Sequence, residues 1–303
     1  MSTPVAFTAG LPDDLPDNLG TLSSAQLRRL ELAIARQYTG RPWGIVVWAF
    51  ANLAFWLALW PLTILGLLPL WLGFVLATIS LAAVYLPTHD AQHDIIARKG
   101  ERLRWLNELV GHATSWLIVL PFNVLRVTHL EHHRHTNVPG SDPDMTTKAP
   151  GPWSAIWRSV VERQPAAQRN RDYADALMRN GRMDLVALGA IYRISFVAIL
   201  SALAWSGFAL EAFFLWWLPM HIAVTYTIFF LSWAPHHPGE GRGRYDNARS
   251  WKSKLGNIGS AGMQYHLVHH LHPYIPLMKT PAAWRAMRPI LEARGCDLGG
   301  LER

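Results

Sequence analysis

The amino-acid sequence predicts an all-α integral membrane protein with four transmembrane helices. Half of its 303 residues are hydrophobic and only 16% are charged, whereas an ordinary soluble domain has about 25% charged residues. Two long stretches, 43–87 and 194–235, are almost free of ionisable side chains. Each is about twice the length that one spanning helix needs, roughly 20 apolar residues, so each predicts two spans.

The first apolar stretch contains no Asp, Glu, Lys, Arg or His from Trp43 to Pro87. Pro61, Gly66 and Pro69 lie near its middle, and these residue types favour turns. We therefore expect one helix on each side of them. A buried helix pair of a soluble protein is the alternative, which the length of the stretch disfavours.

The second apolar stretch runs from Ile194 to Pro235, and Gly207 to Glu211 is expected to divide it into two spans. His221 is the one charged or imidazole side chain after Glu211 in this stretch. Polar groups within spans usually face the protein interior, so we expect His221 to point inward.

The basic residues predict the orientation. The two short turns between spans carry no Lys or Arg, whereas the N-terminal segment, the middle segment and the tail carry all of them. The positive-inside rule then places both termini and the middle segment in the cytoplasm, in a bacterial inner membrane. The net charge of +7 is explained by this orientation, and we expect no nucleic-acid partner. Cys296 is the single cysteine, which excludes disulfides within the chain and iron–sulfur clusters held by it.

The domain organisation follows from these spans. Residues 1–42 are expected to form a polar cytoplasmic segment without a secretory signal, with a helix beginning at "SSAQLRRLELAIARQY". Residues 43–303 are expected to form one membrane domain. Within it, Trp105–Phe122 is too short for a span and predicts an interfacial or re-entrant helix, and "NVPGSDPD" (137–144) predicts a loop.

Three histidine clusters occur on the cytoplasmic side of the spans. Their sequences are "HDAQH", "HLEHH" and "HLVHH", and their histidines are His89, His93, His129, His132, His133, His266, His269 and His270. Residues three and four apart share one helix face, so each cluster presents its imidazoles on one stripe. Because all three lie close to the membrane surface, they can converge in a cytoplasmic helical cap.

Eight imidazoles exceed the needs of one zinc ion, which takes three or four protein ligands. They suit a dinuclear site with at least four protein ligands for each metal and with positions left open. Imidazole binds iron, zinc, copper and nickel, so the ligand type does not choose the metal. A zinc protease is a weaker alternative, because its H-E-x-x-H motif would have Asp90 in place of glutamate and would leave six histidines without a role.

The pattern HxxxH, HxxHH, HxxHH on four spans resembles the membrane fatty acid desaturase and hydroxylase superfamily, over roughly Trp43 to Arg294. This resemblance implies a membrane-bound non-haem di-iron oxidoreductase, with two Fe ions as cofactors and O2 as co-substrate, that attacks an unactivated C–H bond of a lipid. No catalytic residue beyond the metal ligands is implied.

Segments around the clusters carry a narrower resemblance. Five of them are similar to cyanobacterial-type carotenoid ring hydroxylases: "LNELVGH", "VTHLEHHRHTNVPGSDPD", "APHHPGEGRGRYDNARSW", "YHLVHHLHPYIPLMK" and "MRPILEARGC". The resemblance implies hydroxylation of a β-carotene ring. It also implies a ninth ligand just after the last span, for which "SWAPHHPG" offers His236 and His237; His236, which follows Pro235, matches better.

Metal-bound histidines usually donate their second N–H to a carboxylate or a carbonyl. The acids near the clusters are candidates for this role: Asp90, Glu131, Asp142, Asp144 and Asp246. His112, His135 and His272 are expected outside the ligand set.

Electrons must come from another protein, because the chain has no Rossmann glycine pattern, no cysteine set and no haem domain. A soluble donor such as a ferredoxin is implied, and cytoplasmic arginines would either dock it or touch anionic lipid headgroups. Two other functions stay open: a fatty acyl desaturase that introduces a C=C bond, and a non-enzymatic membrane metal-binding protein. The nearly uncharged spans argue against metal transport.

Overall fold

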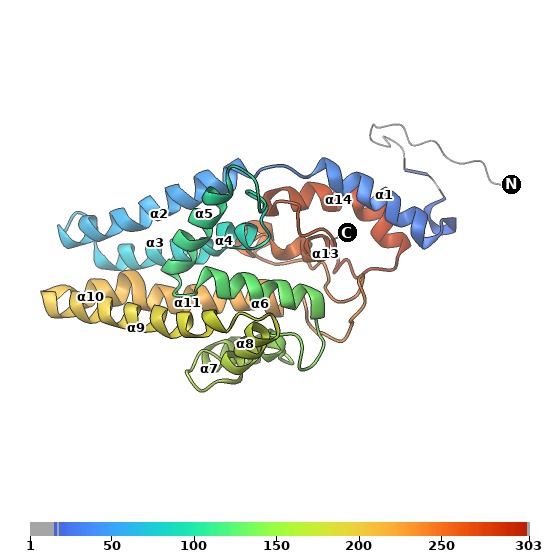
Figure 1. Ribbon diagram of the computed structural model, residues 1–303. Coiled ribbons are helices and arrows are strands. Elements are labelled where there is room, and N and C mark those ends of the chain that lie inside the picture. The colour runs from blue at the N-terminus through green and yellow to red at the C-terminus, as the bar shows by residue number, and fades with distance from the viewer. Residues whose placement is uncertain (1–14, 17, 302–303) are drawn as a thin grey trace.

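The computed structural model describes residues 15–16 and 18–301 of the chain. All regular secondary structure in these residues is helical, which confirms the predicted fold class. Residues 1–14 and 17 of the predicted N-terminal segment lie outside the described residues. The molecule is elongated, with the longest apolar helices at one end and the helices nearest the two termini at the other (Figure 1).

The first apolar stretch forms α2 (Trp43–Ile64) and α3 (Leu70–Ala83), with the turn at the expected place. Gly66 lies in this turn with a φ of 72°, a left-handed conformation that glycine adopts without steric cost. Helix α3 runs on into α4 (Tyr85–Gln92), and residues 70–92 together form one candidate span. The first histidine cluster therefore begins at the end of this span, as expected: His89 lies on α4, and His93 directly follows Gln92.

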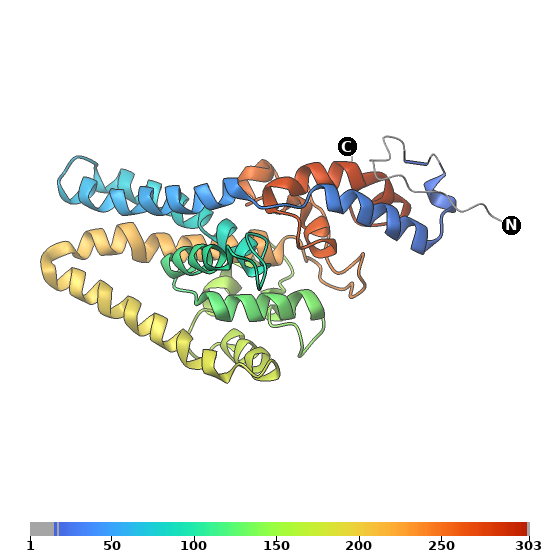
Figure 2. The ribbon, with the colours of Figure 1, turned by 45° about the horizontal axis from the view of Figure 1, so that its top comes forward.

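The second apolar stretch forms α9 (Val186–Leu203), α10 (Ala209–Ala212) and α11 (Leu218–Thr227), within a helical segment of 51 residues from Met183 to Trp233. At 1.5 Å per residue such a segment would be about 75 Å long, far more than the roughly 30 Å of a bilayer core. It turns back at Gly207, whose φ is 92°, and the two arms run antiparallel (Figure 2). This segment supplies two of the four predicted spans. Its first helix begins before the expected Ile194.

Buried tryptophans join the spans. Trp56 donates a hydrogen bond from Nε1 to the carbonyl of Leu215 at 3.0 Å, and Trp216 donates to the carbonyl of Leu117 at 2.8 Å. Both indole rings are almost fully buried. A polar group in an apolar interior needs such a partner, so these bonds fix how neighbouring helices are positioned along one another.

Helices α5 (Arg104–Leu117) and α6 (Phe122–His135) meet at a bend of 98°. As expected of an interfacial or re-entrant helix, α5 does not continue as a straight span. The Phe122 ring packs against Gly111, where a Cβ would lie only 2.2–2.4 Å from ring atoms. The missing side chain of Gly111 thus permits the bend that sends α6, with the second histidine cluster, alongside α4.

A smaller helical cap covers the histidine-bearing ends of these helices. It consists of α1 (Ser24–Gln37), α13 (His266–Leu271) and α14 (Thr280–Ala293), whose apolar side chains form one core. Helix α1 begins at the predicted serines, with Ser23 and Gln26 forming a capping box. Helices α7 (Pro152–Val161) and α8 (Gln168–Arg179) lie against α6 and α11, and α12 (Gly256–Gly259) is a single turn.

Candidate metal centre

The three histidine clusters converge from three separate elements. His89 is on α4 and His93 follows its last residue, while the second cluster is on α6 and the third is on α13. Within each helix the spacing of three and four residues turns the imidazoles to one side. The structure thus brings together eight side chains whose outermost members are 181 positions apart in the chain (270 − 89).

One group of imidazoles comprises His89, His93, His129 and His269. Their ligating nitrogens all lie within 4.8 Å of one another, and Nε2 of His93 is 2.9 Å from Nε2 of His129. His133 lies at the edge of this group, with its Nε2 3.0 Å from that of His269.

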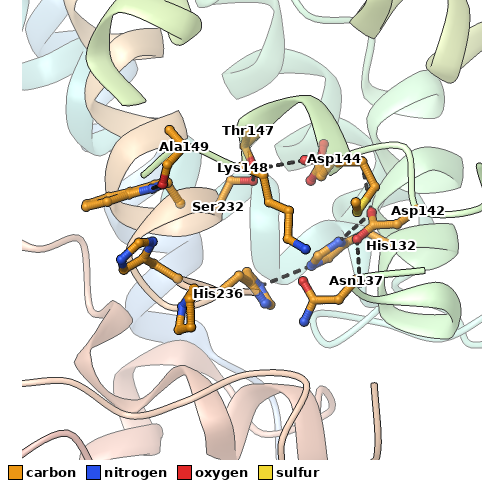
Figure 3. Close-up of a pocket in the computed structure, with 13 residues that line it drawn as sticks. His132, Asn137, Asp142, Asp144, Thr147, Lys148, Ala149, Ser232 and His236 are labelled. Carbon is orange, nitrogen blue, oxygen red and sulfur yellow. Dashed lines mark hydrogen bonds and ion pairs between the residues drawn. The ribbon is translucent and has the colours of Figure 1, made fainter. Parts of the chain in front are cut away.

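A second group comprises His132, His236 and His270, again with nitrogens within 4.8 Å of one another. Nε2 of His236 lies 3.2 Å from Nε2 of His132 and 3.0 Å from Nε2 of His266, and Figure 3 shows the first of these contacts. The ring of His237 instead lies 4.9 Å from the Trp233 ring and belongs to neither group.

These nitrogens fit metal ions. Metal–imidazole bonds of roughly 2.0–2.1 Å place two ligands at right angles about 2.9 Å apart, close to the 2.9–3.2 Å observed between the Nε2 atoms. Both ring nitrogens of His89 and Nε2 of His270 are buried without a hydrogen-bond partner within the described part of the chain. Buried polar atoms are rarely left so in native proteins, and an ion between the rings would satisfy them.

Most of the imidazoles also have the protonation state that a ligand needs. Burial, together with the neighbouring His132, lowers the pKa of His236 to about 3. Burial and adjacent histidines hold the pKa values of His93, His266, His269 and His270 well below 6.5. At neutral pH these rings are uncharged, and only an uncharged imidazole offers a lone pair to a metal. His132 differs: burial lowers its pKa, but the adjacent carboxylate of Asp142 outweighs burial and raises the pKa to about 9, so this ring loses a proton when it binds a metal.

Two further contacts orient the rings of the second group. Nδ1 of His132 lies 2.9 Å from a carboxylate oxygen of Asp142, as Figure 3 shows, and Nδ1 of His236 lies 3.0 Å from the carbonyl oxygen of Asn247. With each Nδ1–H donated in this way, Nε2 is left free to bind a metal.

Among the acids considered from the sequence, Asp142 is the one that bonds a histidine of these groups at hydrogen-bond distance in the described residues. Asp90 accepts from the backbone N–H of Leu277, Glu131 pairs with Arg134, and Asp144 accepts from the hydroxyl of Tyr173.

A buried carboxylate supports the third cluster from the cap. Glu31 of α1 is fully buried and accepts hydrogen bonds from Nε2 of His272 at 2.8 Å and from the hydroxyl of Tyr245 at 2.9 Å. Burial raises the pKa of Glu31, but these hydrogen bonds outweigh it and hold the pKa below the ordinary 4.5. The histidine patterns do not predict a role for Glu31. One signal in the sequence is that Glu31 lies four residues after Leu27, so that a carboxylate occupies the apolar stripe of α1.

A cavity of about 660 Å³ leads away from the histidines between α6, α9 and α11. His89, His129, His132 and His266 are among its lining residues. His221, expected to point inward, lines this cavity and also borders a second hollow between α7 and α11. Apolar residues of the three helices form most of the wall. A separate hollow of about 10 Å³ lies beside His132, His236 and Lys148 (Figure 3), room for about one water molecule.

Comparisons with known proteins bear on this site. The chain is 24% identical to beta-carotene 4-ketolase 3 of Haematococcus lacustris over 69% of its own length and 60% of the relative's. It is 28% identical to a beta-carotene 4-ketolase of Protosiphon botryoides, over 70% and 51% of the two lengths. It is 23% identical to the endoplasmic reticulum omega-3 fatty acid desaturase of Nicotiana tabacum, over 69% and 62%. The chain thus spans between about half and two thirds of the length of these three relatives.

Residues 65–298 match the family described as fatty acid desaturase. This segment includes all three histidine clusters and His236. The match confirms the predicted family of oxidoreductases, and the two imidazole groups are consistent with the di-iron site typical of that family. The relatives named above are carotenoid ketolases and a lipid desaturase rather than ring hydroxylases specifically. The chain belongs to the fatty acid desaturase family.

Proposed function

We propose that this enzyme uses O2 to hydroxylate a ring carbon of a carotenoid dissolved in the membrane. The observation that carries the proposal is the cavity of about 660 Å³ that connects an apolar interior to the two imidazole groups. Its walls include Leu125, Phe196, Val224 and Ile228. Such a chamber would exclude water and hold an uncharged hydrocarbon beside the metals.

The nine histidines named from the sequence form the proposed ligand set. His133 would complete the group of His89, His93, His129 and His269, and His266 would complete the group of His132, His236 and His270. Two irons bound there would supply the activation of O2 that attack on an unactivated C–H bond requires. The protein's own task is to hold the rings in place and to position one substrate carbon.

The reaction balances with an external reductant. Conversion of C–H to C–OH takes one atom of O2, and the second atom leaves as water with two electrons and two protons. We propose that a soluble carrier such as a ferredoxin supplies the electrons from the cytoplasm, with the termini and the metal centre on that side of the inner membrane. One relative, from Nostoc sp. (strain 36), is named sn-1 acyl-lipid omega-3 desaturase (ferredoxin). The cytoplasmic arginines offer a docking surface of complementary charge.

The choice of a carotenoid is supported by the named relatives and by the segments that resemble ring hydroxylases. Several relatives are carotenoid 4-ketolases, whose names describe oxidation of a ring carbon. One of the resembling segments, 127–144, carries His132, Asn137 and Asp142, which shape the metal centre itself.

A second candidate function is desaturation of an acyl chain, and one observation favours it. Arg163, Arg169 and Arg193 line the same cavity, and within the described residues they form no ion pair with a carboxylate. An anionic lipid headgroup would pair with them, whereas a carotene carries no charge.

Expression in a host that accumulates β-carotene distinguishes the two functions. We expect pigments that bear a new ring hydroxyl, labelled when the cells receive ¹⁸O2, and an unchanged fatty acid profile. The His236→Ala variant is the inactive control and the His237→Ala variant is the matched active one. New unsaturated fatty acids with unaltered carotenes would contradict the hydroxylase function and support the desaturase function. No change in either lipid class would contradict both functions.

A further inference from the structure

The large cavity reaches the outer surface of two spanning helices. Val197 of α9 and Trp217, which directly precedes α11, both line it, yet Val197 is 59% exposed and Trp217 is 38% exposed. A residue that lines a cavity and is also exposed lies at an opening. The opening is therefore on the side of the molecule where α9 and α11 diverge from their common turn (Figure 2).

The surface around this opening is apolar. On α9, Ile194 is 68% exposed, and on α11, Ile222 is 39% exposed. A second hollow of about 730 Å³ runs along the outside of α11 beneath α7 and shares Arg163, Trp217 and His221 with the cavity. Since α9 and α11 belong to a candidate span, this surface faces lipid.

The linker between α7 and α8 also lines the cavity. One arginine connects it to α11, and a second connects α9 to it through Asn170 of α8. Arg163 of the linker donates from Nη1 to the backbone carbonyl of His221 in α11 at 2.9 Å. Arg193 of α9 donates from Nη2 to Oδ1 of Asn170 at 2.8 Å, and Asn170 donates in turn to the linker carbonyls of Gln164 and Pro165. The linker thus bridges the two arms of the hairpin.

The hydrogen bond from Arg163 to α11 is weak for one that is donated by a charged group. Burial and the nearby guanidinium of Arg169 lower the pKa of Arg163 to about 10. Its acceptor is a neutral carbonyl, and a hydrogen bond to a carboxylate would be stronger.

We propose that the gap between α9 and α11 is a lateral portal through which a membrane-dissolved apolar substrate enters the cavity, and that the linker around Arg163 closes it. The identification of the cavity as a substrate chamber rests on the proposed function. The route itself holds for a carotenoid and for an acyl chain alike, since either reaches the metal centre from the hydrocarbon phase.

The test measures access to the cavity without measuring turnover. A Val224→Cys substitution, in a Cys296→Ser background, places a thiol on the cavity wall at a residue that is only 6% exposed. The variant is reconstituted in phosphatidylcholine vesicles and treated with pyrene maleimide, which partitions into the bilayer, or with a charged, membrane-impermeant maleimide. We expect the pyrene reagent to label it faster.

Added Val197→Trp should slow pyrene labelling by about tenfold, equivalent to about 1.4 kcal/mol in the activation barrier. Ile194→Trp, on the same exposed face but outside the cavity lining, should leave the rate unchanged. Added Arg163→Leu should increase the rate, because the linker loses its bond to α11. Val197→Phe is the smaller replacement if the tryptophan variant does not fold.

Equal slowing by Val197→Trp and Ile194→Trp, or labelling that is as fast with the charged reagent, would overturn the portal. An unchanged rate in the Arg163→Leu variant would overturn the role of the linker. Because labelling needs neither O2 nor an electron donor, these outcomes are separate from a failure to oxidise carotenoids, which would contradict the proposed function alone.

Discussion

One oxygen of the Asp142 carboxylate lies 2.9 Å from Nδ1 of His132. The same oxygen accepts the backbone N–H of Asp144, and the other oxygen accepts the backbone N–H of Asn137. The loop that follows α6 therefore fixes the carboxylate, and the carboxylate fixes the imidazole with Nε2 turned toward His236. A side chain that touches no metal would in this way decide how one ligand binds it.

Asp142→Asn tests this relationship. The amide keeps the size of the side chain but loses the charge that accepts the Nδ1–H, so we expect metal affinity to fall by about 10- to 100-fold. Metal content after titration with a chelator measures it. Asp144→Asn is the control, because that carboxylate bonds Tyr173. Equal losses in the two variants would contradict a specific role for Asp142.

His236 and His237 are neighbours with different surroundings, which allows a matched comparison. His236→Ala removes an imidazole whose Nε2 lies 3.0 and 3.2 Å from two others, so we expect a loss of bound metal from the second group. His237→Ala should keep the full metal content, because its ring lies against Trp233. Metal analysis of the purified variants distinguishes the two histidines. If the His237→Ala variant loses metal and the His236→Ala variant does not, the ligand is His237 rather than His236.

Removal of the metals should lower thermal stability. Both ring nitrogens of His89 are buried without a hydrogen-bond partner in the described residues, so the metal-free protein bears a desolvation cost that a bound ion relieves. An ion present at 1,000 times its Kd stabilises the folded protein by about 4 kcal/mol. Thermal unfolding of the solubilised protein with and without chelator measures the change. An unaltered Tm after confirmed loss of metal would contradict the inference that a bound metal satisfies these buried nitrogens.

Glu31→Ala should destabilise the cap. The change leaves His272 and Tyr245 without their buried acceptor, and a buried donor left without a partner costs about 1–3 kcal/mol. Glu292→Gln on α14 is the control, because its pair with Arg288 is exposed and surface pairs contribute about 0–1 kcal/mol. Thermal unfolding compares the two, and similar Tm values would argue against a structural role for the Glu31 network.

Gly111→Ala should also destabilise the protein, because the new Cβ would lie 2.2–2.4 Å from atoms of the Phe122 ring. Overpacking of this kind costs about 1–3 kcal/mol. Gly189→Ala, where a Cβ meets nothing within 4 Å, is the control. Restoration of stability in Gly111→Ala by an added Phe122→Leu would show that the ring is the obstacle, and a stable single variant would show that α5 and α6 adjust freely.

The sequence by itself determined the spans and the histidine clusters. Transfer of a side chain into a bilayer has a free energy that adds along the chain, so the apolar stretches from Trp43 and from Ile194 predict spans without knowledge of their neighbours. The helical period likewise places His129, His132 and His133 on one stripe. These signals are local, and the turns at Gly66 and Gly207 lie where the residue types predict them.

Only the tertiary structure decided which groups meet. His236 and His237 are adjacent in sequence, and the end of the last span turns one toward His132 and the other toward Trp233. Of the acids near the clusters, Asp142 is the one in the described residues that lies within hydrogen-bond distance of a histidine of the two groups, because the loop after α6 folds back on itself. Glu31 bonds His272 across 241 positions of the chain. Metal coordination and buried hydrogen bonds depend on distances of about 3 Å, and such distances between remote residues are set by the packing of whole helices rather than by local sequence.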